Sequence, residues 1–372
     1  MAQPQESQFT IQTVFDWFTS TLGRIVIALI VPAVTFIIMW RGFIFLRDGN
    51  ASQLVIALVA IIWGVGGVAL IYFITNWLIE QLPPDWTSRL QPFLFIGPAV
   101  IILAWYLAIP TFRTLLISLR DRTGDEFVGL ANYVAIFTER NMTIAFRNNL
   151  LWIAFGASLS VLFGLLVAVL ADRSRFENFA KSMIFLPMAI SMVGAGVIWN
   201  FIYEVKEAGS AQIGLLNAIW VGLGGQPQAW TAMLQPWNNL FLIIIVIWLQ
   251  TGYAMVIFSA AIKGIPNELL EAARVDGATE VQIFFRIMIP YIMGTIITVT
   301  TTIVIFTLKI FDIVMVMTGG QFGTHVIATQ FYRQAFTNQN KGYAAAIAII
   351  LVILVIPVMI YNLRQFADEE AF

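Results

Sequence analysis

The chain has 372 residues, of which 59% are hydrophobic and only 11% are charged. A soluble domain carries about 25% charged residues, so this composition, with a mean hydropathy of +0.85, excludes a water-soluble protein and predicts one that crosses a membrane several times. The formal net charge of −1 argues against a nucleic-acid surface, and the absence of cysteine excludes disulfides and thiolate metal sites.

Eight apolar runs are long enough to cross a bilayer as helices. They predict an all-α membrane protein with eight transmembrane helices, at about 24–46, 54–79, 92–112, 149–171, 183–204, 240–262, 291–318 and 344–362. No charged leader and no small-residue cleavage site accompany the first run, so we expect it to be retained. Residues 9–22 mix polar and apolar side chains, which fits either a helix in the membrane interface or a partly ordered tail.

The basic residues in the loops do not orient the chain across the membrane. With an even number of spans, both termini share a side. If the 263–290 loop lies on that side too, the side carries nine Lys and Arg residues against ten on the other. The orientation therefore needs another kind of evidence.

Span four carries a small residue at every fourth position, namely Gly156, Ser160, Gly164 and Ala168. Small side chains on one stripe of a helix let a neighbouring backbone approach closely, which is how helices associate in lipid. We expect this stripe to be a packing face.

The polar segment 263–290, between spans six and seven, has the local signals of two short helices around a glycine. Pro266 fits the first turn of a helix, and Gly277 can adopt the left-handed conformation that ends it. Thr279 and Gln282 have the spacing of a capping box at the start of a second helix.

One face of that second helix is expected to be apolar, with Val281, Phe284, Phe285 and Met288. Pro290 is expected to open the next span. Ala272 and Ala273 leave little side chain between the first helix and a partner. The segment is either a docking element for a cytoplasmic partner or a well-capped connection, and capping alone does not separate these interpretations.

Lys309 and Asp312 are opposite charges deep in predicted span seven. At i and i+3 they would share a helical face and neutralise each other, because an unpaired charge is costly in a membrane. They form either an internal ion pair or a polar step in a transport pathway. The single histidine, His325, lies in a predicted loop, where an ordinary polar role is favoured over a ligand or proton relay.

Part of the 263–290 segment has a distinctive pattern: Glu271-Ala272-Ala273, then Asp276-Gly277-Ala278, then Phe284, Ile287 and Pro290. This pattern resembles the signature loop of the permease subunits of bacterial binding-protein-dependent ABC importers, which is cytoplasmic and inserts into a cleft of the ATPase subunit. The resemblance implies cytoplasmic termini, a type I permease bundle, and ATPase-coupling roles for Glu271, Ala272, Ala273, Asp276, Gly277, Phe284 and Pro290.

The resemblance covers roughly residues 90–365. Phe127–Tyr133, Ala171-Asp172-Arg173 and Phe185-Leu186-Pro187 resemble sugar permeases of the maltose-permease type, and Lys309–Val314 with Ile247–Gly252 resembles the α-glucoside and glucosylglycerol branch. Gln321 stands where many sugar permeases have proline, which puts the transfer of detail from maltose in doubt.

The resemblance also implies the organisation of the chain. Residues 1–23 would be an N-terminal interfacial or cytoplasmic segment, 24–90 two accessory transmembrane helices, 91–364 the core permease domain and 365–372 a cytoplasmic tail. The predicted location is the bacterial inner membrane.

The implied partners are two copies of an ABC ATPase subunit, a second homologous permease subunit and a periplasmic solute-binding protein. The chain has no Gly-x-x-x-x-Gly-Lys-Ser/Thr phosphate loop, so it is expected to bind no cofactor and to be no enzyme itself. ATP and magnesium would belong to the partner ATPase.

The cargo site is implied by counting outward from the loop. Leu249 and Tyr253 before it and Phe306 after it match pocket positions of maltose-type permeases, and Gln250 and Thr307 occupy pocket positions with different residue types. These five residues, with Lys309 and Asp312, form the predicted substrate pathway. Ordinary packing is the alternative for the aromatic residues.

The predicted function is therefore ATP-driven import of an α-glucoside or glucosylated compatible solute such as glucosylglycerol, trehalose, sucrose or maltose. One rival is a secondary transporter that uses Lys309 and Asp312 as coupling charges. It predicts inverted repeats, which the sequence does not show. The other rival, a membrane enzyme, is disfavoured by the single histidine.

Overall fold

The computed structural model describes residues 21–49, 51–172 and 175–369. In this part of the chain the regular secondary structure is helical, apart from one isolated bridge between Arg120 and Phe127. Most of the interfacial segment expected at 9–22 lies outside the described residues. The chain divides into two compact units, residues 1–110 and 111–372, and each unit is described by itself.

The first unit contains long apolar helices with almost no buried side chains. These are α2 (Thr21–Asp48), α3 (Gln53–Glu80) and α4 (Pro84–Leu103), which continues through a π-helical turn (Ala104–Ala108) into α5 (Ile109–Ser118). Most of α5 belongs to the second unit. The Trp63 indole N–H donates to the Met39 carbonyl at 3.1 Å and joins α3 to α2. A helix that is apolar on all sides, and that the rest of the chain does not cover, is expected to contact lipid.

The boundary between the two compact units falls inside the third span. The sequence predicts a border between accessory and core helices at 90/91, whereas the first compact unit extends to Pro110 and so includes most of the third span. The third span itself is a single apolar helical stretch of 35 residues, from Pro84 to Ser118.

The second unit is a bundle of helices joined by short surface helices. In chain order they are α6 (Ala131–Thr138), α7 (Arg140–Leu151), α8 (Ser158–Asp172), α9 (Glu177–Phe185), α10 (Met192–Tyr203), α11 (Leu215–Gly222), α12 (Trp237–Lys263), α13 (Asn267–Val275), α14 (Glu280–Ile283), α15 (Ile289–Tyr291), α16 (Met293–Leu308), α17 (Asp312–Met317), α18 (Ile327–Tyr332) and α19 (Lys341–Glu369).

Each of the eight predicted apolar runs falls on a helical segment suited to a membrane. Within the described residues, six helices are long and apolar enough to cross a bilayer, and two more spans are bent pairs. The first pair joins Glu177–Ala189 to Met192–Tyr203 at 104°, and the second joins Glu280–Tyr291 to Met293–Leu308 at 70°. The all-α membrane fold is therefore confirmed.

Span seven differs from its prediction. The apolar run 291–318 is not one helix, because α16 ends at Leu308 and α17 begins at Asp312. The Asn149 side-chain amide donates to the Leu308 carbonyl at 3.1 Å, and its oxygen accepts from the Ile327 N–H at 2.8 Å. A helix can break in a membrane protein where another group satisfies its last carbonyls, and the buried Asn149 does so here.

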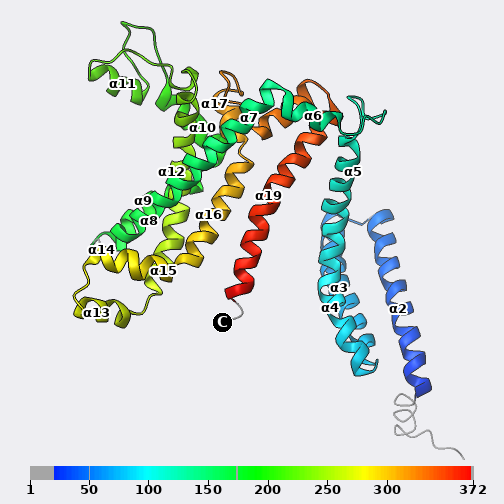
Figure 1. Ribbon diagram of the computed structural model, residues 1–372. Helices are drawn as coiled ribbons and strands as arrows, with labels where there is room; N and C mark the ends of the chain where they lie inside the picture. Colours follow the sequence, from blue (N-terminus) through cyan, green and yellow to red (C-terminus); the bar gives the residue numbers. More distant parts are fainter. Residues whose placement is uncertain (1–20, 50, 173–174, 370–372) are drawn as a thin grey trace, which may run out of the picture. The chain divides into compact units, whose positions relative to one another are not determined.

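The core of the second unit forms where α8 packs along α12 (Figure 1). The predicted stripe of small residues lies at this contact, since Ser160, Gly164 and Ala168 are all buried. A Cβ added at Gly164 would lie 2.4 Å from the Ala254 Cβ. The packing role predicted for the stripe is confirmed.

The short helices of the second unit gather at its two ends. Figure 1 shows α13, α14 and α15 at one end of the second unit, near the C-terminal end of α19, with α11 and α17 at the opposite end. The segment 263–290 and the loops around residues 205–236 and 318–326 therefore lie far apart along the bundle axis.

Candidate functional site

The docking loop, defined as residues 263–290, begins with a well-terminated helix. At the end of α13, the Gly277 N–H donates to the Arg274 carbonyl and the Ala278 N–H to the Ala273 carbonyl, both at 3.0 Å. Gly277 has φ +81°. These two bonds and the left-handed glycine form a Schellman motif, so the helix-ending conformation predicted for Gly277 is confirmed.

The second helical segment starts as predicted. The Gln282 N–H donates to Thr279 Oγ1 at 3.3 Å, and the Thr279 N–H donates back to Gln282 Oε1 at 2.8 Å, which is a complete capping box. Pro266 precedes the first helical residue of α13, one position earlier than expected. Pro290 lies within the short α15, so it does not open the next span, which begins at Met293 after the bend.

An apolar cluster holds the docking loop against the bundle. Ile265, Ile283, Met288 and Ile292 are buried in it, with Ala273 and Phe284 packed against them. Of the residues expected on the apolar face, Phe284 and Met288 pack in this cluster, whereas Val281 and Phe285 are exposed. Ile283 and Met288 are buried because Ile265 and Ile292, from the two ends of the loop, pack against the side of the segment on which they lie.

The outer surface of the loop is free in this chain. Glu271, Ala272, Asp276 and Gly277 are exposed, and Val275 is 87% exposed despite being apolar. Sequence reasoning missed Val275, Val281 and Phe285 as surface residues. Leu270 and Ala273, three positions apart, mark the packed face of α13, and Val275 lies off that face.

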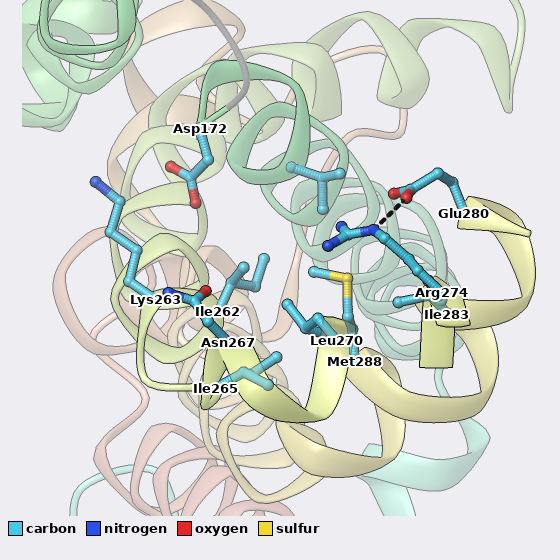
Figure 2. A pocket seen from close by; sticks show the side chains of 11 residues that line it. Asp172, Ile262, Lys263, Ile265, Asn267, Leu270, Arg274, Glu280, Ile283 and Met288 are labelled. Carbon is cyan, nitrogen blue, oxygen red and sulfur yellow. Dashed lines mark hydrogen bonds and ion pairs between the residues drawn. The ribbon is translucent and has the colours of Figure 1, made fainter. Parts of the chain in front are cut away.

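A pocket of about 460 Å³ lies between the docking loop and the ends of α8 and α12 (Figure 2). Within it the Arg274 Nε donates to Glu280 Oε1 at 2.9 Å. This hydrogen bond and the negative charge of Glu280 raise the pKa of Arg274, so its guanidinium stays charged. Figure 2 shows Asp172 and Lys263 on the side of the pocket facing Arg274.

Four charged side chains and one serine beside this pocket form a network that we call the coupling cluster: Asp172, Glu177, Lys181, Ser259 and Lys263. The Lys181 ammonium binds Asp172 and Ser259 and also Glu177 Oε1, the last at 2.6 Å. Ser259 Oγ donates to Asp172 Oδ1 at 2.8 Å, and Lys263 binds Glu177. Asp172 Oδ2 is buried with no hydrogen-bond partner in the described protein.

Sequence reasoning missed the coupling cluster. Its members come from three helices, α8, α9 and α12. Only Glu177 and Lys181 have a helical spacing, so no sequence periodicity predicts that the whole cluster meets. The one available signal is that acidic and basic residues gather at the ends of apolar runs on the same predicted side.

A second, open cavity of about 290 Å³ brings together four predicted pathway residues, Leu249, Gln250, Tyr253 and Phe306. Its other lining residues are Met188, Ile190, Met192, Thr302 and Ile303. Three elements therefore build it: α12, α16 and the bend between α9 and α10. Among the described residues, no protein group hydrogen-bonds the Gln250 amide or the Tyr253 hydroxyl.

The other three pathway residues do not line this cavity. Thr307 is fully buried, and its hydroxyl donates to the Ile303 carbonyl at 2.7 Å. Lys309 is exposed and Asp312 half-buried. No ion pair joins these two in the described chain, because α16 ends at Leu308, before Lys309, and α17 begins at Asp312, so no single helical face carries both residues. The expected ion pair is therefore wrong.

Asparagines that the sequence reasoning had overlooked hold the loop at the opposite end. Asn148 donates to the carbonyls of Gly323 and His325 at 2.7 and 2.8 Å, and Asn238 donates to that of Phe322 at 2.8 Å. Both asparagines are fully buried. Adjacent asparagine pairs inside apolar helices, at 148–149 and 238–239, were the available sequence signal.

His325 occupies an ordinary structural place in that loop. Its Nδ1 lies 3.1 Å from Thr329 Oγ1. Burial, and then the positive charge of Arg333, lower the pKa of His325, so the imidazole is neutral near pH 7.

Comparison with known proteins supports the same interpretation as the geometry. Residues 160–367 match the family described as the binding-protein-dependent transport system inner membrane component. Two crystal structures of a bacterial ABC importer of alginate have a similar fold, each with a TM-score of 0.64. The first is 19% identical, and the match covers 75% of this chain and 96% of that chain. The second, a complex with a periplasmic protein that binds an alginate pentasaccharide, is 20% identical, and the match covers 75% of this chain and 94% of that chain.

Two curated relatives are close in sequence. The osmoprotective compounds uptake permease protein GgtC of Synechocystis sp. is 52% identical over 277 residues, which is 74% of this chain and 99% of that protein. The alpha-glucoside transport system permease protein AglF of Rhizobium meliloti is 46% identical over 333 residues, covering 86% and 99%. The chain belongs to the family of inner membrane permease components of binding-protein-dependent ABC importers.

Proposed function

We propose that this permease imports an α-glucoside or a glucosylated compatible solute, of the glucosylglycerol, trehalose, sucrose or maltose class. The carrying observation is the open cavity, which combines the rings of Tyr253 and Phe306 with the unpaired amide of Gln250. A sugar has apolar ring faces that stack on aromatic side chains and hydroxyls that need hydrogen-bond partners. The relatives support the same class of cargo, since AglF is named for alpha-glucoside transport and GgtC for uptake of osmoprotective compounds.

The proposed complex contains two ATPase subunits, a second homologous permease subunit and a periplasmic solute-binding protein. The docking loop and both termini face the cytoplasm, and the ATPase seats on the exposed surface of Glu271, Ala272, Asp276 and Gly277. ATP and magnesium stay in that partner. Closure of the ATPase dimer moves the docking loop and switches the bundle from inward-facing to outward-facing, and hydrolysis resets it.

The cargo is tested by ATP hydrolysis in the complete complex, reconstituted in lipid vesicles with its binding protein. We expect at least one of trehalose, sucrose, maltose and glucosylglycerol to stimulate hydrolysis above the sugar-free rate. Vesicles without the binding protein are the control. If none of the four sugars stimulates hydrolysis, the proposed cargo class is wrong.

The docking role is tested at Gly277. Its φ of +81° costs a residue with a side chain about 1–2 kcal/mol, and a β-branched residue is least suited to it. Gly277→Val should therefore deform the end of α13 and reduce both co-purification of the ATPase and transport. Asn tolerates the left-handed region, so Gly277→Asn should retain more of both.

The docking role is contradicted if Gly277→Val and Glu271→Ala both leave ATPase binding and transport at wild-type levels. Bundle integrity is checked in the same preparations by size-exclusion chromatography, which separates a loss of docking from misfolding.

A further inference from the structure

We propose that α9 is the element that transmits movement of the docking loop to the sugar cavity, with the Glu177–Lys263 ion pair as its attachment and Gly252 as its point of contact on α12. This inference rests on the proposed function, and it assigns positioning roles to Glu177 and Gly252, which line neither cavity, and to Lys263 at the start of the docking loop. Three observations along the length of α9 carry it.

The first observation is at the N-terminal end of α9. Glu177 binds Lys263, the last residue of α12 and the first of the docking loop, 86 positions away in sequence. Glu177 also binds Lys181 within α9, and Lys181 binds Asp172 at the end of α8. The start of the docking loop is thus tied by charge to α9.

The second observation is in the C-terminal half of α9. A Cβ added at Gly252 would lie 2.5 Å from the Ile184 carbonyl oxygen and 2.9 Å from the Phe185 Cα. The α9 backbone therefore rests directly on α12, at the residue next to Tyr253 of the cavity. Backbone contacts of this kind cannot be relieved by a change of side-chain rotamer.

The third observation is the segment that follows α9. A 3₁₀ turn (Leu186–Ala189) leads into the 104° bend before α10. Met188, Ile190 and Met192 from this bend line the sugar cavity opposite Gln250 and Tyr253. A helix of nine residues is only about 13 Å long, so its two ends lie within one rigid element.

The ion pair of Glu177 and Lys263 is suited to transmitting movement of the docking loop more than to stabilising the fold. Lys263 has a side chain that is 55% exposed, and an ion pair with so exposed a member contributes little to folding. Its consequence is mechanical: when the docking loop moves, Glu177 follows, α9 turns on Gly252, and the cavity wall at Met188–Met192 shifts. The buried Asp172 Oδ2 without a partner leaves an acceptor free for Lys263 or Arg274 in another arrangement of the loop.

The test measures ATP hydrolysis by the complete complex in vesicles, with and without a stimulating sugar. In Lys263→Gln and in Glu177→Gln, the ATPase should still co-purify, but the ratio of stimulated to basal rate should fall about 2- to 30-fold, the range of mutations along a coupling route. Lys263→Arg keeps the charge and should restore the ratio. Arg47→Gln removes a comparably exposed ion pair in the first unit and should leave the ratio unchanged.

A covalent replacement of the ion pair gives a second measurement. The chain has no cysteine, so Glu177→Cys with Lys263→Cys introduces the only two thiols. The reduced double variant should be uncoupled, and joining the thiols with a short bis-maleimide should recover sugar stimulation. Failure to recover after complete crosslinking overturns the inference.

The proposed function and this inference fail in different ways. If wild-type complex shows no sugar stimulation, the cargo is wrong. If wild type is stimulated and Lys263→Gln and Glu177→Gln are stimulated equally, only the role of α9 is wrong. A lower thermal midpoint of these variants without a change in the ratio of rates would assign the ion pair to stability alone and would also overturn the inference.

Discussion

At the residue scale, two polar side chains that line the open cavity, those of Gln250 and Tyr253, differ from the threonines of the same spans. The hydroxyls of Thr300 and Thr301 donate to carbonyls of their own helix, so they need no further partner. Gln250 and Tyr253 have no such bond among the described residues. A polar side chain left unbonded beside a cavity in a membrane has a free energy cost unless water or a ligand binds it.

We therefore expect Gln250→Ala and Tyr253→Ala to weaken the response to sugar. One hydrogen bond contributes about 0.5–1.5 kcal/mol, so the sugar-loaded binding protein needed for half-maximal ATP hydrolysis should increase about 2- to 10-fold in Gln250→Ala. Tyr253→Ala should have the larger effect, because it also removes a stacking surface. The titration is run on the reconstituted complex.

Thr300→Val is the matched control, because it removes a hydroxyl from α16 that does not line the cavity. Equal shifts in Thr300→Val and Gln250→Ala would contradict a specific role for the cavity.

At the scale of single elements, helix packing depends on a few positions without side chains. Gly164 on α8 approaches Ala254 and the Met255 backbone of α12, and Gly196 on α10 approaches Val316 of α17. The glycines Gly64 and Gly66 of α3 have open space around them. Not every glycine of the first unit is loosely surrounded, however, since Gly42 and Gly67 lie against the side chains of Trp63 and Met39.

Gly164→Ala should destabilise the bundle, because the new methyl group would overlap Ala254 Cβ, and overpacking costs about 1–3 kcal/mol. Gly66→Ala should be neutral or stabilising, since Ala is the better helix former by up to about 1 kcal/mol and nothing lies within 4 Å of the added Cβ. The thermal midpoints of the two detergent-solubilised variants are compared with wild type. A midpoint that falls more in Gly66→Ala than in Gly164→Ala would contradict this account of the packing.

At the scale of the whole molecule, the chain consists of two compact units that divide at Pro110. GgtC matches over 99% of its own length and yet covers only 74% of this chain. The match with AglF covers 86% of this chain.

Deletion of residues 1–83 should leave the second unit assembled and responsive to sugar. It removes two spans, an even number, so the remaining chain keeps its orientation, and it leaves the third span whole from Pro84 to Ser118. The measurement is co-purification of the ATPase and its sugar-stimulated hydrolysis, with the full-length complex as the control. Loss of both in a truncated protein that still elutes as a single species would show that the first two spans are required.

Local chemistry made much of this protein predictable. The eight apolar runs, the capping box at Thr279 and the left-handed Gly277 depend only on residues within a few positions of each other or on a run long enough for the bilayer. The resemblance to maltose-type permeases, applied by counting outward from the loop, also picked out Leu249, Gln250, Tyr253 and Phe306, which line one cavity.

The remaining features are decided by contacts between residues far apart in sequence. The break after Leu308 depends on Asn149, which is 159 positions away, and an apolar run of 28 residues gave no sign of it. The side of the 280–288 segment that is buried depends on Ile265 and Ile292, and it leaves Val281 and Phe285 exposed. The ion pair of Glu177 and Lys263 joins two helices whose relative position no periodicity encodes.

By itself, the sequence determined that the chain is a helical membrane protein with a capped polar loop at 263–290, because hydropathy and helix capping act within single elements. Only the tertiary structure decided that Lys309 and Asp312 are not partners, that Thr307 faces the core, and that α9 connects the docking loop to the cavity. Each of these depends on where whole helices meet, which is set by the packing of residues such as Gly164 and Gly252 against other elements of the bundle.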